Sequence, residues 1–158
     1  MNFDSAFDAL IAHEGGLVNN PNDKGGLTKY GISQRSYPTL DIAALTLPEV
    51  RELYKRDFWD RAQCDRLPAD LAFAVFDAAV NSGIGQAIRW LQRSLNVADD
   101  GVVGALTLAA VQRFDDTSAL CARFSGHRLE FMTRLSTWDV FGKGWARRVA
   151  TNLQKVGA

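Results

Sequence analysis

The sequence is poor in cysteine and histidine, and this scarcity limits the chemistry that it can carry. Its 158 residues include two cysteines, Cys64 and Cys121, and two histidines, His13 and His127. A catalytic zinc site needs three protein ligands, and no HExxH pair is present. We therefore expect no metal, no cofactor and no zinc amidase or peptidase activity. Because a chain of this length builds a core without a disulfide, we expect two reduced, mostly buried thiols.

Long apolar runs and an excess of one charge are also missing. No stretch approaches the roughly 18 uninterrupted apolar residues of a membrane span. The net charge is zero, which argues against a general binder of nucleic acid. The first residues, Met1–Ser5, have neither the basic region nor the apolar run of a Sec signal, so we expect synthesis in the cytoplasm without one.

The charge is nevertheless unevenly spread. Residues 121–158 contain seven basic and two acidic residues. One interpretation is a solvated helix face, and the other is a mildly basic surface, around Trp145, Arg147, Arg148 and Lys155, toward an anionic polymer or membrane.

Hydrophobic periodicity predicts a mainly helical chain. Helices are expected at about 3–13, 46–56, 68–81, 86–95, 104–114, 117–136 and 144–156. The segment 117–136 is one long helix or a pair broken near Gly126, and Thr46 with Glu49 forms a capping-box pattern. No linker divides the chain, so we expect a single domain over 1–158.

One long irregular segment, about 15–46, interrupts this helical pattern, with a short strand or hairpin expected near 27–33. Loops of this length in compact domains are often functional. The segment begins directly after Glu14, at the predicted end of the first helix. The negative end of a helix dipole disfavours the charged form of a carboxylate, so Glu14 is suited to act as a general acid.

A second carboxylate, Asp23, lies nine residues further along. Two carboxylates across a cleft are the minimum for glycoside hydrolysis, in which one donates a proton and the other activates water or stabilises the transition state. Thr28 is placed to orient that water, and Gly25 and Gly26 allow the backbone to approach a sugar closely. The alternative for Asp23 is an Asx-turn residue.

Aromatic residues supply flat apolar faces for pyranose rings, and three lie where they would suit this role. These are Tyr30, Trp59 and Trp90. For Trp90 the alternative is stronger, because it lies at helical spacing in a core-like run.

These segments and others further along the sequence resemble those of a known family. The stretch His13–Ile32 is similar to the Glu-Gly-Gly signature of the glycoside hydrolase family 108 lysozymes, N-acetylmuramidases of phage, prophage and bacterial genomes. The segments Phe76–Gly83, Leu91–Gln92 and Asp100–Thr107 resemble the predicted peptidoglycan domain that follows in this family, and Phe141–Val149 resembles its C-terminal ending. The Glu-x8-Asp-x4-Thr spacing also resembles the triad of phage T4-type lysozymes, with one residue fewer before the threonine.

The resemblance implies an α+β, mainly α-helical, lysozyme-like fold with a small β-hairpin or irregular lobe near the N-terminus. About 1–65 would form the lobe with the catalytic glutamate, and about 66–158 a helical lobe. Glu14 would be the catalytic acid, with Asp23 and Thr28 completing the site. Gly25, Gly26, Tyr30, Asp77 and Asn81 would contact substrate. For Asp77 and Asn81 the alternative is that they tie their helix to its neighbours.

The implied activity is cleavage of the β-1,4 bond between N-acetylmuramic acid and N-acetylglucosamine in bacterial peptidoglycan, leading to lysis. The alternative is a non-catalytic peptidoglycan-binding or secretion-associated protein. Glycan strands of the wall are the expected partner of a monomer that acts in the periplasm or outside the cell after release, as a phage endolysin does.

Overall fold

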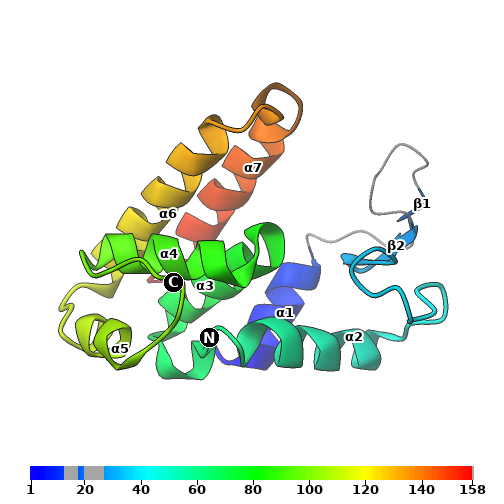
Figure 1. Cartoon of the computed structure of the whole chain (residues 1–158), viewed down its shortest axis with the longest axis horizontal. Helices are drawn as coiled ribbons and strands as arrows, with labels where there is room; N and C mark the ends of the chain where they lie inside the picture. Colours follow the sequence, from blue (N-terminus) through cyan, green and yellow to red (C-terminus); the bar gives the residue numbers. More distant parts are fainter. Residues whose placement is uncertain (13–17, 20–26, 158) are drawn as a thin grey trace. The chain divides into compact units, whose positions relative to one another are not determined.

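A computed structural model describes residues 1–12, 18–19 and 27–157. The chain divides into two compact units, Asn2–Asp57 and Phe58–Ala158 together with Met1. The described residues form seven α-helices and a three-stranded antiparallel sheet near the N-terminus (Figure 1). The prediction of a mainly α-helical fold with a small β element near the N-terminus is therefore confirmed.

The first unit begins with helix α1, Phe3–Ile11. The side chain of Asn2 caps it by accepting a hydrogen bond from the backbone N–H of Ser5 at 3.0 Å, which satisfies one of the free donors of the first turn. Its buried face consists of apolar side chains at helical spacing: Phe3, Ala6, Phe7 and Leu10. Phe7 packs edge-on against Tyr54, with ring centroids 5.7 Å apart.

The sheet of this unit contains β1, Val18–Asn19, β2, Leu27–Lys29, and β3, Ile32–Ser33. β2 lies in the centre and pairs antiparallel with both neighbours. Tyr30 and Gly31 connect β2 to β3 with φ angles of 51° and 79°. Positive φ at both positions of a two-residue turn matches the right-handed twist of a hairpin. The hairpin expected near 27–33 is thus present.

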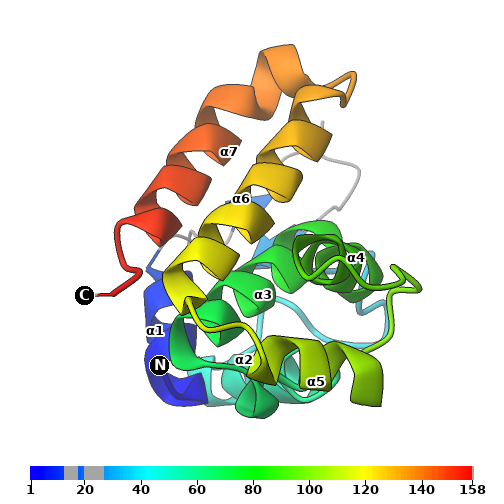
Figure 2. The ribbon, with the colours of Figure 1, turned by 90° about the vertical axis from the view of Figure 1, so that its left-hand side faces the viewer.

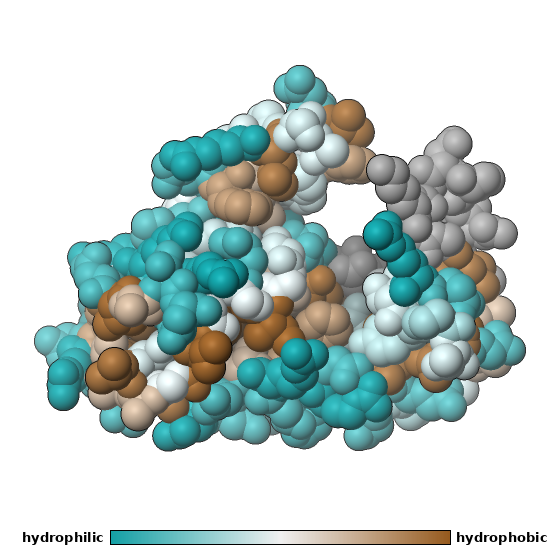
Figure 3. Space-filling model, viewed as in Figure 1, coloured by the Kyte–Doolittle hydropathy of each residue, from teal (hydrophilic) through white to brown (hydrophobic). Residues whose placement is uncertain are grey.

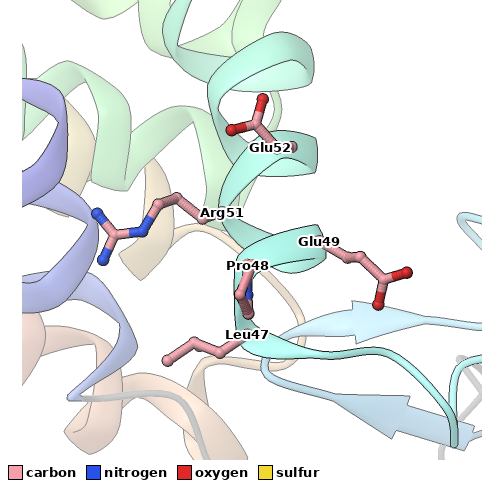
Figure 4. A pocket seen from close by; sticks show the side chains of 5 residues that line it. All are labelled: Leu47, Pro48, Glu49, Arg51 and Glu52. Carbon is pink, nitrogen blue, oxygen red and sulfur yellow. The ribbon is translucent and has the colours of Figure 1, made fainter.

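Helix α2, Leu47–Tyr54, carries the predicted capping box between Thr46 and Glu49. A surface hollow of about 360 Å³ lies against it (Figure 4). Of the side chains that line this hollow, Arg51 points toward α1 and binds Asp4 and Asp8 at 2.6 and 2.8 Å, whereas Glu49 is held by its cap. These two charged groups are thus occupied with holding the helix in place.

The second unit is helical. A π-helical turn, η1, spans the point in the sequence where the two units divide, and the second unit continues with a 3-10 turn, η2, and five α-helices. Their bounds are η1 Lys55–Trp59, η2 Cys64–Arg66, α3 Ala69–Ser82, α4 Ile84–Ser94, α5 Ala105–Gln112, α6 Thr117–Thr133 and α7 Trp138–Leu153. α3 is buried along almost its whole length and contacts both α4 and α6, while α6 and α7 run antiparallel side by side (Figure 2).

For the C-terminal helices, the structure decides between two open alternatives and changes one expectation. Gly126 lies inside the single helix α6 and does not break it. The last helix begins at Trp138 rather than at Gly144. A Cβ atom on Gly142 would lie 2.5 Å from the Trp138 ring, so this glycine permits the indole to lie against the helix backbone and does not end the helix.

Both cysteines are buried and free, in agreement with the expectation of two reduced thiols. Burial raises the pKa of the Cys121 thiol to about 11 and raises that of Cys64 even further. Such thiols are protonated at neutral pH and react slowly. In the part of the chain that the structure describes, no helix is long and apolar enough to cross a membrane.

Candidate functional site

The predicted catalytic carboxylates lie in the segment about which the structure gives no placement. Glu14, Asp23, Gly25 and Gly26 are outside the described residues, and their roles stay predictions. Along the chain, Glu14 lies two residues after Ala12, the residue that caps the C-terminal end of α1. The dipole argument for a raised proton affinity at Glu14 rests on this position.

The other two predicted residues of the first unit lie in and beside the hairpin. Thr28 is the middle residue of β2 and pairs with Val18 on one side and Ser33 on the other. Tyr30 forms the turn, and its carbonyl accepts a hydrogen bond from the Tyr54 hydroxyl at 2.9 Å. The Lys29 ammonium lies 5.7 Å from the centre of the Tyr30 ring. The hairpin thus brings Thr28 and Tyr30 together on a backbone anchored to α2.

Asp77, a predicted substrate-binding residue in the second unit, lies in the core. Its side chain is fully buried on α3. Arg128 of α6 donates to one carboxylate oxygen at 2.7 Å, and Arg148 of α7 donates to the other at 2.8 Å. The carboxylate therefore ties three helices together, which is the alternative that the sequence left open, and it offers no surface to a ligand in this structure.

The charge on Asp77 is stabilised by its two partners. Burial raises the pKa of the carboxyl, but the guanidinium groups of Arg128 and Arg148 outweigh burial, so the pKa of Asp77 lies below its ordinary value. Burial also lowers the pKa of Arg128, but a guanidinium starts so far above neutrality that it stays charged. At neutral pH the cluster is a buried anion between two cations.

Asn81, one turn further along α3, is exposed at the edge of a cavity of about 170 Å³. The cavity is lined by residues of α3, α6, the turn after α6, and α7: Asn81, Ser82, Phe131, Met132, Leu135 and Trp145. The amide oxygen of Asn81 accepts long hydrogen bonds from Arg128 and from the Ser82 hydroxyl, both at 3.4 Å. Asn81 thus lies in a position where it can contact a ligand, and its predicted role stays a prediction.

Two of the three aromatic residues proposed from the sequence to face a sugar are buried. Trp59 and Trp90 are 1% and 0% exposed and pack edge-on against Phe76 and Phe124, so neither can stack on a sugar. Their rings are large apolar surfaces that gain more from burial in the core.

A group of accessible rings lies instead on α7. Trp138, Phe141 and Trp145 form a surface cluster with centroids 6.2 and 5.8 Å from Trp145. Their spacing of three and four residues was the signal for this cluster, and it was missed because the helix was expected to start later.

A second, larger cavity of about 560 Å³ lies beside α5. The Gln92 side chain, 1% exposed, shapes one wall by donating to Asp100 at 2.7 Å and accepting from the Gly101 N–H at 2.8 Å. It also donates to the Thr107 hydroxyl at 3.2 Å. The segments Leu91–Gln92 and Asp100–Thr107, which carried the resemblance to the peptidoglycan domain, are therefore joined through one buried amide that fixes the loop between α4 and α5.

Comparison with known proteins identifies the family of this chain. The sequence model of the glycosyl hydrolase 108 family matches residues 7–83, and that of the predicted peptidoglycan domain matches residues 86–150. The chain belongs to the glycosyl hydrolase 108 family, with the predicted peptidoglycan domain following. Among curated proteins, none matches the chain.

A solved structure, that of Brucella abortus SagA, is similar over nearly the whole length. The two share 32% sequence identity with a TM-score of 0.90, over 97% of this chain and 92% of the other. Family membership supports a glycoside hydrolase that acts on peptidoglycan.

Proposed function

We propose that the chain is an N-acetylmuramidase that cleaves the β-1,4 bond between N-acetylmuramic acid and N-acetylglucosamine and so lyses the bacterial wall. The observation that carries this proposal is the family match over residues 7–83, which contains Glu14, Asp23 and Thr28 in one short segment. A glycosidase needs an acid and a second carboxylate, and this segment holds both.

In the proposed reaction, Glu14 starts protonated and gives its proton to the glycosidic oxygen as the bond from that oxygen to C1 breaks. Asp23 either stabilises the positive charge that develops on the ring, in which case the ionised Glu14 takes a proton from the attacking water, or takes that proton itself. The Thr28 hydroxyl orients that water. The oxygen of the water bonds to C1, which leaves a reducing N-acetylmuramic acid end on one product and a free 4-hydroxyl on the other.

Digestion of purified peptidoglycan, followed by mass spectrometry of the chain ends, tests the proposal. Wild type should create new reducing N-acetylmuramic acid ends, and Glu14→Gln should lose at least about a thousandfold in rate, because a catalytic acid contributes roughly that much. Glu52→Gln is the matched control: it makes the same chemical change at an exposed position on α2 and should retain activity.

Three outcomes contradict this proposal in different ways. Freed amines point to an amidase or peptidase. Full turnover by Glu14→Gln removes the acid role. Binding of peptidoglycan by wild type without any new ends favours the non-catalytic, wall-binding or secretion-associated alternative.

We also propose that the enzyme acts on the wall beyond the cytoplasm, after release through a membrane pore. The location of its substrate supports this route. Expression without a pore-forming partner should leave cells intact, whereas permeabilising the membrane should start lysis. Lysis that begins without permeabilisation contradicts the route.

A further inference from the structure

We propose that the surface aromatic cluster on α7 and the cavity beside it bind N-acetylated sugar rings of the glycan strand, as a subsite contributed by the helical unit. The cluster consists of Trp138, Phe141 and Trp145, and the cavity lies between Trp145 and the C-terminal end of α3. This inference rests on the proposed function for the identity of the polymer, but it concerns binding and not bond cleavage.

The aromatic cluster lies on the surface and is not part of the core. Phe141 is 53% exposed and its neighbour Val140 is 75% exposed. Apolar side chains lie on the surface near the upper end of the α6–α7 pair in the view of Figure 3. Large apolar groups gathered on a surface mark interaction sites, and a tryptophan with one wet edge is common where a ligand is bound.

The chain holds these rings in a fixed position. A side chain at Gly142 would collide with the Trp138 ring at 2.5 Å, so the indole lies flat on the helix. Arg148, one turn beyond Trp145, is bound to Asp77, and Asp77 lies one turn before Asn81. The buried ion cluster therefore sets the register of α7 against α3 and places Trp145 beside Asn81.

The polar groups of the cavity match a sugar. A guanidinium only donates hydrogen bonds, so the amide oxygen of Asn81 must face Arg128, and its NH₂ group is directed elsewhere. Within the described residues, that NH₂ group and the indole N–H of Trp145 have no hydrogen-bond acceptor. Two free donors beside an apolar ring suit an N-acetyl carbonyl and the ring hydroxyls.

The size and composition of the cavity favour this ligand over the alternatives. A volume of about 170 Å³ is below the roughly 300–1,000 Å³ of pockets that enclose a whole ligand, so the cavity suits one part of a longer ligand, such as a single ring of a glycan strand. The larger cavity beside α5 has exposed apolar residues at its rim, such as Leu106 at 81% exposure, but its buried amide is already satisfied by its own loop. An anionic membrane is the other occupant to test, because basic residues flank the cluster.

Binding of N-acetylchitotetraose and of insoluble purified peptidoglycan tests the subsite. Both are measured in the Glu14→Gln background, so that no bond is cut. Tryptophan fluorescence should change on titration, because Trp138 and Trp145 are partly exposed whereas Trp59 and Trp90 are buried. Trp145→Ala and Asn81→Ala should each weaken binding, Trp145→Ala by about tenfold or more.

Leu106→Ala is the matched control, since it removes an exposed apolar side chain at the other cavity and should bind as the background does. Far-UV circular dichroism checks that each variant is folded. The proposal is overturned if neither ligand binds, if Trp145→Ala and Asn81→Ala bind normally, or if only Leu106→Ala loses binding. It is also overturned if Trp145→Ala loses binding to phosphatidylglycerol vesicles while glycan binding is kept.

These results separate the subsite from the proposed cleavage. Wild type that binds through Trp145 but makes no reducing ends contradicts the muramidase and leaves the subsite standing. If wild type makes those ends while Trp145→Ala binds normally, the muramidase proposal stands and the subsite is contradicted.

Discussion

Each of the two units contains a cluster of three charges, and the signs of the charges are reversed between the two clusters. In the helical unit, Asp77 lies between Arg128 and Arg148, with side chains 0%, 3% and 17% exposed. In the N-terminal unit, Arg51 lies between Asp4 and Asp8, with side chains 30%, 71% and 67% exposed. The N–O distances are nearly equal, from 2.6 to 2.8 Å.

Equal geometry does not mean equal energy. Water and salt screen the exposed pairs, so such pairs contribute little to stability. The buried pairs are screened much less, and a partner left alone there is a buried, uncompensated charge. The difference indicates that the buried cluster of the helical unit contributes more to stability than the exposed cluster on α1 and α2.

The largest effect should come from Asp77→Asn. It removes the anion between two guanidinium groups and should lower the free energy of unfolding by about 3–5 kcal/mol. Urea denaturation followed by far-UV circular dichroism measures this loss. Asp115→Asn, the same change at an exposed position, should have almost no effect. A loss of less than about 1 kcal/mol in Asp77→Asn would remove the distinction between the clusters.

Acid should reduce this contribution. The pKa of Asp77 is lower in the folded protein than in the unfolded chain, so its contribution is complete above the ordinary aspartate pKa and is lost as the pH falls through the lowered value. The stability difference between wild type and Asp77→Asn should therefore shrink between about pH 5 and pH 2. Urea denaturation at several pH values measures it, and a constant difference would contradict the assigned charge state.

The smallest effect should come from the exposed cluster. Replacing Asp4 and Asp8 together by asparagine should lower the free energy of unfolding by no more than about 1 kcal/mol. That loss should vanish in about 1 M salt, where screening acts within roughly 3 Å. Urea denaturation with and without salt checks it. A loss as large as that of Asp77→Asn would show that exposure does not separate the two clusters.

The helices were predictable from sequence wherever apolar spacing decides the matter. The expected segments 68–81 and 86–95 correspond to α3 and α4 within two residues at each end. The start of α7 was not predictable in this way, because Gly142 and Gly144 are usually signs of an ending helix. Gly142 lies inside the helix because the Trp138 ring packs against it, and the spacing of apolar residues does not reveal this contact.

The carboxylates Glu14 and Asp23 stay predictions, because both lie outside the described residues. The aromatic residues could be compared with the structure, and an aromatic side chain serves equally in a core or on a surface. Trp59 and Trp90 were therefore read as sugar-binding faces and are core residues. Asp77 was read with two alternatives, and its burial between two arginines depends on helices 51 and 71 residues further along.

The place of α3 has a consequence for how this chain can evolve or be recombined. The family match that contains the predicted catalytic residues ends at residue 83 and so includes α3, but α3 lies in the compact unit that starts at residue 58. Exchanging the two matched regions as cassettes would combine an α3 from one parent with α6 and α7 from another. A junction near residue 57 keeps Asp77 with its own arginines. The compact structural unit therefore begins at a different residue from the one at which the family match ends.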